Sequence, residues 1–266
     1  MEFEAAESHR VRNISPLSHT MKNIMDLEII MPAYNEEERI AATILSFYKE
    51  LKGHIRFKFI ISEDGSTDQT KVILERLSHQ IPMTILTRST RQGYSQGVLR
   101  ALRDSKAEYV CCVDSDGQYD PKDFWKLWKL RFTGDVVVGY RSDRHDSFFR
   151  VMLSRIFYHV FRYAFPKNIH DPSCSFVLFH RNVVKKLTPI LGLTNEGFWW
   201  EFMARIRQLR FSVSEQVVRH RSRILGKSQI YSLWSIPMIG IRHVVAMLRV
   251  ILLPKMAGFD QNVTKR

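Results

Sequence analysis

Short apolar runs and helical stretches alternate five times between residues 27 and 139 of this 266-residue chain. The apolar runs are typical of buried strands, and the connections between strand and helix are short. Strands that alternate with helices in this way form a mostly parallel sheet with helices on its faces. The sequence therefore predicts an α/β fold. The expected strands are residues 27–32, 56–62, 83–87, 109–113 and 135–139.

The intervening stretches predict helices whose first turns carry capping side chains. Asn35 is expected to cap the first helix, with Glu36 and the two glutamates after it in its first turn, where carboxylates complement the helix dipole. Ser66 or Thr67 is expected to cap the second helix. Two further helices are predicted over residues 93–104 and from 121 to about 130.

Two carboxylates, Asp114 and Asp116, follow the predicted strand 109–113, and Gly117 then allows the chain to turn. Ligands of open α/β sheets bind at the carboxyl ends of the strands. Carboxylate oxygens suit Mg²⁺ or Mn²⁺ shared with a diphosphate. The alternative is an acidic surface turn, since Asp-x-Asp is a common pattern.

The other predicted strands also end in polar residues. Residues 34–36 follow the first strand, Asp64 follows the second, and Arg141 follows the fifth. One such end is explained by an ordinary turn, but four at one edge of a sheet favour a binding site. The sequence contains neither a GxGxxG motif nor a Walker A loop, so neither a dinucleotide oxidoreductase nor a P-loop enzyme is indicated.

The chain is basic, with 40 Lys and Arg against 27 Asp and Glu, a formal net charge of +13. Such a charge favours anionic partners, which are nucleic acid, an anionic membrane or phosphorylated ligands. No nucleic-acid partner is expected, because the cations cluster with apolar helices and no nucleic-acid-binding motif is found. The three cysteines form no disulfide or zinc pattern, which fits a reducing compartment.

Two late segments are apolar but interrupted by cations. Residues 147–165 are rich in aromatics yet include Arg155 and Arg162, and residues 233–253 include Arg242 and Arg249. Charges at mid-bilayer are costly, so helices lying on a membrane surface are predicted rather than spanning ones. A core helix is the alternative for the first segment. We expect a disordered tail over residues 1–25, a folded domain over 26–230 and an amphipathic membrane-associated tail over 231–266.

Four motifs resemble, in sequence and order, those of family 2 glycosyltransferases. They are Pro32-Ala33-Tyr34-Asn35-Glu36, Glu63-Asp64-Gly65-Ser66-Thr67-Asp68, Arg91-Gln92-Gly93 and Asp114-Ser115-Asp116-Gly117-Gln118. Within that family the chain is similar to dolichol-phosphate mannose synthases and bacterial polyprenyl-phosphate glycosyltransferases, supported by residues 138–141, 150–154 and 171–176. The resemblance implies a glycosyltransferase-A type sheet and an inverting, metal-dependent hexosyltransferase. Its donor would be GDP-mannose or a UDP-sugar, and its acceptor a polyprenyl or dolichyl phosphate at the cytoplasmic face of a membrane.

The resemblance also implies roles for individual residues. The nucleotide-sugar would be held by Pro32, Tyr34, Glu36, Asp64, Asp114, Ser115, Arg141 and Arg223, the last two at its phosphates. The metal, Mg²⁺ or Mn²⁺, would be held by Asp114, Asp116 and Gln118, and the transfer itself would depend on Asp116, Arg150 and Ser154, the last two receiving the acceptor phosphate. In the late loop, Gln229 stands where relatives often have Lys, and Lys227 lies two places earlier, so the second phosphate cation stays open.

Two acceptor classes remain open on chemical grounds. A hydroxyl acceptor, as in polysaccharide or glycolipid assembly, needs a general base, for which Glu201 and Asp171 are the candidates. A phosphate acceptor is already ionised near neutrality and needs cations instead, and the arginines after residue 140 favour it. A non-catalytic module that binds a nucleotide-sugar or a membrane is the third hypothesis. The sequence leaves open the sugar and the nucleobase.

Overall fold

The computed structural model describes residues 25–141, 158, 159, 162, 164–192, 194, 197–221 and 244–251. The strands are β1 (Leu27–Ala33), β2 (Phe57–Glu63), β3 (Met83–Leu86), β4 (Tyr109–Cys112), β5 (Val136–Arg141), β6 (Val177–His180) and β7 (Val213–Val218). The helices are α1 (Ile40–Leu51), α2 (Thr70–Ser78), α3 (Tyr94–Asp104), the 3₁₀ turn η2 (Pro121–Asp123), α4 (Phe124–Lys129), α6 (Arg181–Leu187) and α7 (Phe198–Gln208), and residues 244–251 are also helical.

The seven strands form a single sheet in the order β3-β2-β1-β4-β6-β5-β7. β1 pairs in parallel with β2 and β4, β2 with β3, and β5 with β7. Only β6 is antiparallel to its neighbours, which are β4 and β5. The prediction of a mostly parallel α/β sheet is therefore confirmed, and the insertion of β6 between β4 and β5 is a feature that the strand–helix alternation did not indicate.

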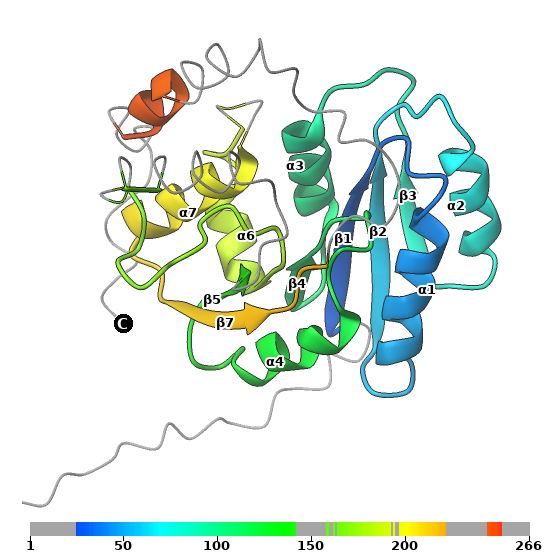
Figure 1. The fold of residues 1–266 in the computed structure, drawn as a ribbon, viewed down its shortest axis with the longest axis horizontal. Coiled ribbons are helices and arrows are strands. Elements are labelled where there is room, and N and C mark those ends of the chain that lie inside the picture. Colours follow the sequence, from blue (N-terminus) through cyan, green and yellow to red (C-terminus); the bar gives the residue numbers. More distant parts are fainter. Residues whose placement is uncertain are drawn as a thin grey trace, which may run out of the picture.

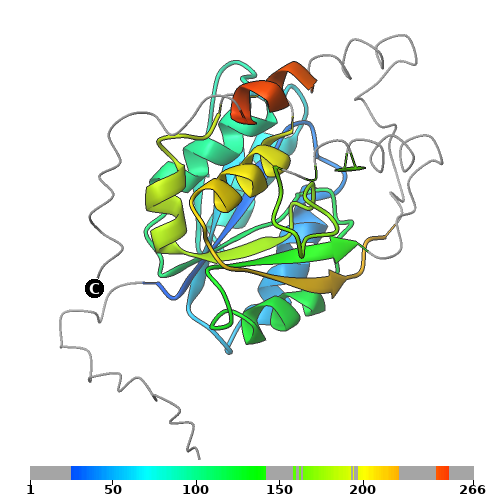
Figure 2. The same ribbon diagram turned by 90° about the vertical axis from the view of Figure 1, so that its left-hand side faces the viewer.

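Helices cover both faces of this sheet. Figure 2 shows α3, α6 and α7 on one face and α1 and α4 on the other, and Figure 1 shows α2 beside α1 at the edge formed by β3. All four residues of β4 are buried, which agrees with a strand enclosed on both faces. The helix over residues 244–251 packs beyond α7, where Met247 and Val250 are fully buried.

Two details of the predicted helix starts are wrong. α1 begins at Ile40, five residues after the expected cap, and Asn35 instead has a positive φ of 52°. The Asn35 side chain accepts a hydrogen bond from the Thr67 backbone N–H (2.9 Å), so it links two loops rather than capping a helix. At the start of α2, the backbone N–H of Thr70 donates to the Asp68 carboxylate (2.9 Å), and neither Ser66 nor Thr67 caps the helix.

Several predicted segments lie wholly or largely outside the described residues. These are the tail over residues 1–25, of which only residue 25 is described, and most of residues 147–165 and 231–266. None of the helices in the described part of the chain is both long and apolar enough to span a membrane.

Candidate active site

Six of the seven strands point the same way, so their carboxyl ends meet at one edge of the sheet. The predicted site residues that the structure describes lie at this edge: Pro32, Tyr34, Glu36, Asp64, Asp114, Ser115, Asp116, Gln118 and Arg141. Because β6 runs in the opposite direction, residues 171–176, which precede it, reach the same edge. Arg150, Ser154 and Arg223 lie outside the described residues.

Asp64 holds the loop that leads into α3. Its side-chain oxygens accept hydrogen bonds from the backbone N–H groups of Gln92 (2.9 Å) and Gly93 (2.7 Å). Gly93 has a φ of 93°, a backbone conformation that residues other than glycine rarely adopt, and it directly precedes α3. Asp64 is 5% exposed, so these backbone donors serve a carboxylate that is almost fully removed from water.

Tyr34 and Glu36 lie in the loop that follows β1. The Arg91 guanidinium stacks 4.0 Å from the centre of the Tyr34 ring, a cation–π contact. The Glu36 carboxylate pairs with Arg39 (3.3 Å), and the Glu36 backbone N–H donates to the Thr70 hydroxyl at the start of α2 (2.8 Å). The loops after β1, β2 and β3 are therefore joined into one wall of the site.

The turn that follows β4 is anchored on β1 and α1. The Ser115 hydroxyl donates to the Pro32 carbonyl oxygen (2.7 Å), and the Ser115 carbonyl oxygen accepts from the Thr43 hydroxyl (3.0 Å). Gly117 then turns the chain with a φ of 74°. Parallel pairing of β1 with β4 sets this neighbourhood, because it brings the ends of the two strands together.

Both oxygens of Asp114 receive a hydroxyl group. Tyr94, the first residue of α3, donates to Oδ1 (2.7 Å), and Ser175, just before β6, donates to Oδ2 (2.5 Å). The Trp199 indole N–H of α7 in turn donates to the Tyr94 hydroxyl (2.7 Å). Tyr94 is 40% exposed as a residue, but its hydroxyl is enclosed between Asp114 and Trp199. Burial of the hydroxyl, together with the nearby Asp114 charge, raises the pKa of Tyr94 well above its ordinary value, so the hydroxyl keeps its proton.

Asp116 and Gln118 supply the remaining predicted metal ligands. An Asp116 oxygen accepts from the Gln118 backbone N–H (3.1 Å). Among the residues that the structure describes, His, Cys, Asp and Glu do not gather in threes as metal ligands. Mg²⁺ commonly binds through one or two carboxylates and completes its shell with waters and substrate phosphates. Asp114 and Asp116 fit an ion shared with a diphosphate, and do not fit an all-protein metal cage.

Residues 219–221, which follow β7, are held beside the Asp114–Gln118 turn by hydrogen bonds and ion pairs. Arg221 donates its backbone N–H to the Gln118 carbonyl oxygen (2.8 Å), and the Gln118 side-chain amide donates to the Arg221 carbonyl oxygen (2.9 Å). The Asp120 carboxylate pairs with Arg219 (3.3 Å) and Arg221 (3.0 Å). Burial alone would raise the pKa of Asp120, but the Lys122 backbone N–H and the two arginines lower it below its ordinary value.

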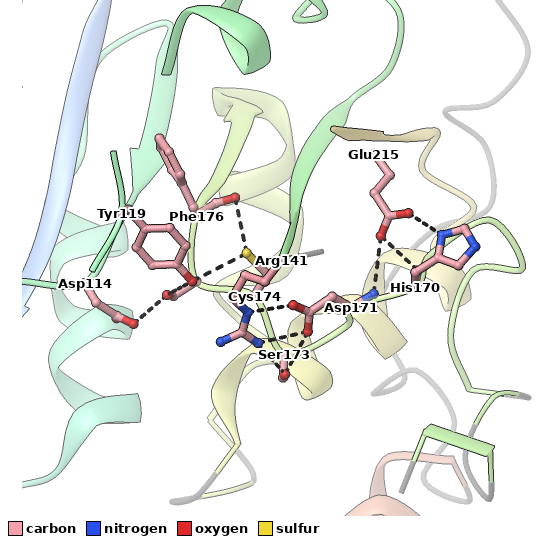
Figure 3. A network of polar contacts seen from close by, with 10 residues as sticks. Asp114, Tyr119, Arg141, His170, Asp171, Ser173, Cys174, Phe176 and Glu215 are labelled. Carbon is pink, nitrogen blue, oxygen red and sulfur yellow. Dashed lines mark hydrogen bonds and ion pairs between the residues drawn. The ribbon is translucent and has the colours of Figure 1, made fainter. Parts of the chain in front are cut away.

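Arg141 ends β5 in a buried ion pair with Asp171. Its Nε and Nη2 atoms donate to the two Asp171 oxygens (2.6 and 2.9 Å), and Nη2 also donates to the Ser173 hydroxyl (2.9 Å). A two-pronged pair of this kind fixes the guanidinium in direction as well as position. Figure 3 shows this pair, and beyond it the backbone of Asp171 and His170 reaching Glu215 of β7.

Tyr119 and Cys174 connect the Arg141 pair to Asp114. The Tyr119 hydroxyl lies 3.5 Å from the Cys174 sulfur and 3.1 Å from the Ser175 hydroxyl, which donates to Asp114. Burial raises the pKa of the Cys174 thiol to about 12 and that of the Tyr119 hydroxyl well above its ordinary value. Both groups are therefore protonated near neutrality and carry no charge.

Sequence reasoning missed four side chains of this site: Tyr94, Trp199, Ser175 and Asp120. Tyr94 lies in the first turn of the helix predicted over residues 93–104, and Ser175 lies in a motif cited for the resemblance, but no role was predicted for either residue. Their neighbours come from 61 and 105 positions away along the chain. No spacing rule links positions so far apart, and only the sheet order shows the contact.

Comparison with known proteins gives the family. Residues 28–188 match the family described as Glycosyl transferase family 2, which is more than half of the chain. The chain belongs to glycosyl transferase family 2. This confirms the predicted family and the predicted class of enzyme, a hexosyltransferase.

Curated relatives of this family 2 glycosyltransferase act on lipid phosphates, according to their names. A dolichyl-phosphate beta-glucosyltransferase of Dictyostelium discoideum is 27% identical over 82% of this chain and 73% of its own length. A dolichol-phosphate mannosyltransferase of Pyrococcus furiosus is also 27% identical, over 62% of this chain and 50% of its own length. The chain thus matches only half of the second relative.

Solved structures confirm the fold. Glucosyl-3-phosphoglycerate synthase from Mycobacterium tuberculosis, in complex with Mn²⁺, uridine diphosphate and glucosyl-3-phosphoglycerate, superposes with a TM-score of 0.65. The match covers 87% of this chain and 82% of that chain at 16% identity. The glycosyltransferase-A type sheet expected from the resemblance is therefore present.

Both candidate general bases of this glycosyltransferase have structural partners. Asp171 is 4% exposed and binds Arg141 through both oxygens. Glu201, in the first turn of α7, has no exposed surface and accepts from the backbone and the hydroxyl of Thr194 (3.2 and 2.8 Å). A general base must lie within hydrogen-bond reach of the proton that it removes, and in this structure both carboxylates are buried and hydrogen-bonded within the protein.

Asp120→Asn tests the ion pairs that Asp120 forms with Arg219 and Arg221, after β7. The folded-state pKa of Asp120 lies below its unfolded value of about 3.9, so its ionised form stabilises the fold above about pH 4. That contribution is lost as the pH falls through the folded-state pKa. We expect wild type to melt a few degrees above Asp120→Asn at pH 7, with a gap that narrows below about pH 4. Because Arg219 and Arg221 are 60% and 59% exposed, added salt should also reduce the gap.

Thermal unfolding from pH 7 down to about pH 2.5 measures the gap. Asp104→Asn, at the exposed end of α3, is the matched control. A gap between wild type and Asp120→Asn that does not change with pH would contradict the assignment.

Proposed function

We propose that this family 2 glycosyltransferase moves a hexose from a nucleotide-diphospho-sugar to a polyprenyl or dolichyl phosphate, with inversion and with a bound Mg²⁺ or Mn²⁺. The observation that carries the proposal is the edge of the sheet at which Asp64, Asp114 and Asp116 meet while both possible bases, Asp171 and Glu201, are withdrawn into structural contacts. Such a site suits a nucleoside diphosphate, and neither of the two candidate bases is free to serve a hydroxyl acceptor as the described residues are arranged.

The donor would lie across the ends of β1, β2 and β4. Tyr34, with Arg91 on its ring, and Asp64 would hold the nucleoside, and Ser115 would lie near the ribose. Asp116 with Asp114 and Gln118 would hold the metal, which supplies positive charge to the leaving diphosphate. Arg223, two residues beyond Arg221 in the sequence, is the other proposed phosphate cation.

The transfer would need positioning more than proton removal. An oxygen of the acceptor phosphate would attack the anomeric carbon as the bond from that carbon to the diphosphate oxygen breaks, with the bond electrons leaving on the nucleoside diphosphate. The phosphate is already ionised, so no group has to take a proton. Arg150 and Ser154 are the proposed acceptor ligands. Arg141, at the end of β5, is the proposed donor-phosphate cation, through its Nη1 group, which takes no part in its bonds to Asp171 and Ser173.

The named relatives support a lipid-phosphate acceptor and leave the sugar open. The Dictyostelium discoideum relative is named for glucose, the Pyrococcus furiosus relative for mannose, and an undecaprenyl-phosphate transferase of Serratia proteamaculans for a modified arabinose. The alternative acceptor, a saccharide hydroxyl, would need a base other than Asp171 or Glu201 as the structure places them. Membership of the family weighs against the non-catalytic module.

We also propose that the enzyme is peripheral, at the cytoplasmic face of a membrane. The helix over residues 244–251 buries Met247 and Val250 against the protein and leaves four apolar side chains between 42% and 46% exposed. These are Val244, Val245, Leu248 and Ile251. An apolar helix face on a protein of net charge +13 suits an anionic lipid surface.

The metal site is tested with Asp116→Ala. Removing a carboxylate that holds the ion should cost several kcal/mol of transition-state stabilisation, which lowers turnover on the order of 100-fold or more. Initial rates would be measured with UDP-glucose and GDP-mannose, polyprenyl phosphate and Mn²⁺ or Mg²⁺, with chelator as the second arm. Asp104→Ala is the control. The assignment would be rejected if Asp116→Ala, and the wild type with chelator, were both as active as the untreated wild type.

The acceptor class is tested at Arg150. If Arg150 grips the acceptor phosphate, Arg150→Ala loses charged hydrogen bonds, and KM for polyprenyl phosphate should rise roughly 10- to 100-fold. Donor affinity, measured by calorimetry, should stay unchanged. Arg150→Lys should recover only part of the loss, because it keeps the charge without the two-pronged geometry. Equal acceptor dependence in wild type and both variants would favour a hydroxyl acceptor.

The membrane surface is tested with Leu248→Glu. The change replaces an apolar anchor by an anion, so binding to vesicles of anionic phospholipid should fall on the order of tenfold in a sedimentation assay. High salt should release part of the wild-type protein. Phe132→Glu is the control, because Phe132 is 75% exposed but follows α4, on the opposite face of the sheet. Equal loss in the two variants would contradict a docking role for residues 244–251.

A further inference from the structure

A chain of two hydrogen bonds runs from α7 to the first carboxylate of the Asp114–Asp116 pair. The Trp199 indole donates to the Tyr94 hydroxyl, and the Tyr94 hydroxyl donates to Asp114 Oδ1, each over 2.7 Å. The direction is fixed, because an indole N–H can only donate and an ionised carboxylate can only accept. The Tyr94 hydroxyl thus accepts a hydrogen bond from Trp199 and donates its own proton in a hydrogen bond to Asp114.

The second oxygen of Asp114 is fixed from the other side. Ser175 donates to Oδ2 over 2.5 Å, from the segment that leads into β6. A carboxylate with a separate donor on each oxygen cannot rotate without breaking one of the bonds. Figure 3 shows Asp114 at the end of a network that continues through Tyr119 to Cys174. The plane of the Asp114 carboxylate is therefore set by α3 on one side and by the β6 segment on the other.

Packing alone does not explain a tyrosine at position 94. The residue is 40% exposed, so its ring is not needed to fill the core, and a phenylalanine ring would give the same contacts. Trp199 is only 6% exposed, and its indole N–H needs an acceptor inside the protein, which the Tyr94 hydroxyl provides. The hydroxyl is the part of Tyr94 that has partners.

We propose that Tyr94 is a positioning residue that holds Asp114 in the orientation required for the metal and the donor, and that Trp199 acts through it. α7 follows β6 in the chain, whereas Asp114 follows β4, so the relay couples the two halves of the sheet at the reacting edge. The inference rests on the metal site of the proposed function.

Two effects of losing the Tyr94 hydroxyl oppose each other. Without the Tyr94 donor, Asp114 Oδ1 keeps more negative charge and would attract a cation more strongly, while Ser175 still donates to Oδ2. It also loses its fixed orientation. Loss of outer-shell partners typically costs about 10- to 100-fold in metal affinity or activity, so orientation is the larger effect. We therefore expect weaker metal binding.

Mn²⁺ binding without turnover is the direct test. Free Mn²⁺ would be followed by electron paramagnetic resonance while it is titrated into the full chain in the presence of UDP and, in parallel, of GDP. Tyr94→Phe removes one oxygen and keeps the ring, and we expect its Mn²⁺ dissociation constant to rise about tenfold. Trp199→Phe should raise it less, since the Tyr94 hydroxyl remains.

The double variant Tyr94→Phe/Trp199→Phe separates a relay from two independent contributions. If Trp199 acts only through the Tyr94 hydroxyl, the double variant should bind Mn²⁺ no more weakly than Tyr94→Phe alone. Tyr48→Phe and Trp125→Phe are matched controls. Tyr48 lies on α1, and Trp125 donates its indole N–H to Glu50 (2.9 Å), so neither change touches Asp114.

Three results would overturn the inference. Wild-type affinity in Tyr94→Phe would show that the hydroxyl does not position Asp114, and additive losses in the double variant would show that Trp199 does not act through it. Equal losses in the controls would show a general effect on folding, which thermal unfolding of each variant would reveal. Absence of Mn²⁺ binding by the wild type with either nucleotide would instead remove the proposed metal site, and the inference with it.

Discussion

Parallel pairing of β1 with β2 and β4 is the constraint on which the site depends. Parallel strands need a crossover between them, so every loop that carries a functional side chain leaves the sheet at the same edge. β6 completes the site for the opposite reason. It is antiparallel to β4, so the chain enters it from that edge, and Ser175 arrives beside Asp114 although the two lie 61 positions apart. Parallel pairing brings the carboxylates to one edge of the sheet, and the antiparallel strand β6 brings the side chains that hydrogen-bond to them.

A gathering of carboxylates is unfavourable unless each charge has partners. Asp64 receives two backbone N–H groups, Asp114 two hydroxyl groups and Asp171 a guanidinium. Each donor replaces a hydrogen bond from water that the carboxylate loses on burial. The same bonds fix side-chain directions before any ligand arrives. The same hydrogen bonds therefore stabilise this edge of the sheet and orient its carboxylates toward a cation.

The sequence allowed the strand positions, the mostly parallel sheet and the main carboxylates to be predicted, because these depend on local apolar runs and on polar residues at their ends. Other features depended on distant contacts and could not be predicted. Asn35, next to three glutamates, has the local pattern of a helix cap, but its contact with Thr67 on the next loop prevails. The position of β6 between β4 and β5 leaves no periodic signal, so the neighbours of Asp114 and Arg141 stayed unknown. Local rules predict elements, whereas the sheet order decides which side chains meet.

The geometry around Asp116 links metal and donor binding in the proposed reaction. Among the described residues, no third His, Cys, Asp or Glu joins Asp114 and Asp116 as a metal ligand. An ion held by these two carboxylates would keep most of its waters and would bind weakly by itself. A diphosphate would replace some of those waters, and each ligand would then strengthen the binding of the other by the same factor. Gln118 extends this linkage, because its amide and carbonyl groups hold Arg221 at the start of the segment that leads to Arg223. Metal and nucleotide would thus bind cooperatively at the edge of the sheet. The segment after β7 begins beside Gln118, next to the proposed site of the metal and the diphosphate.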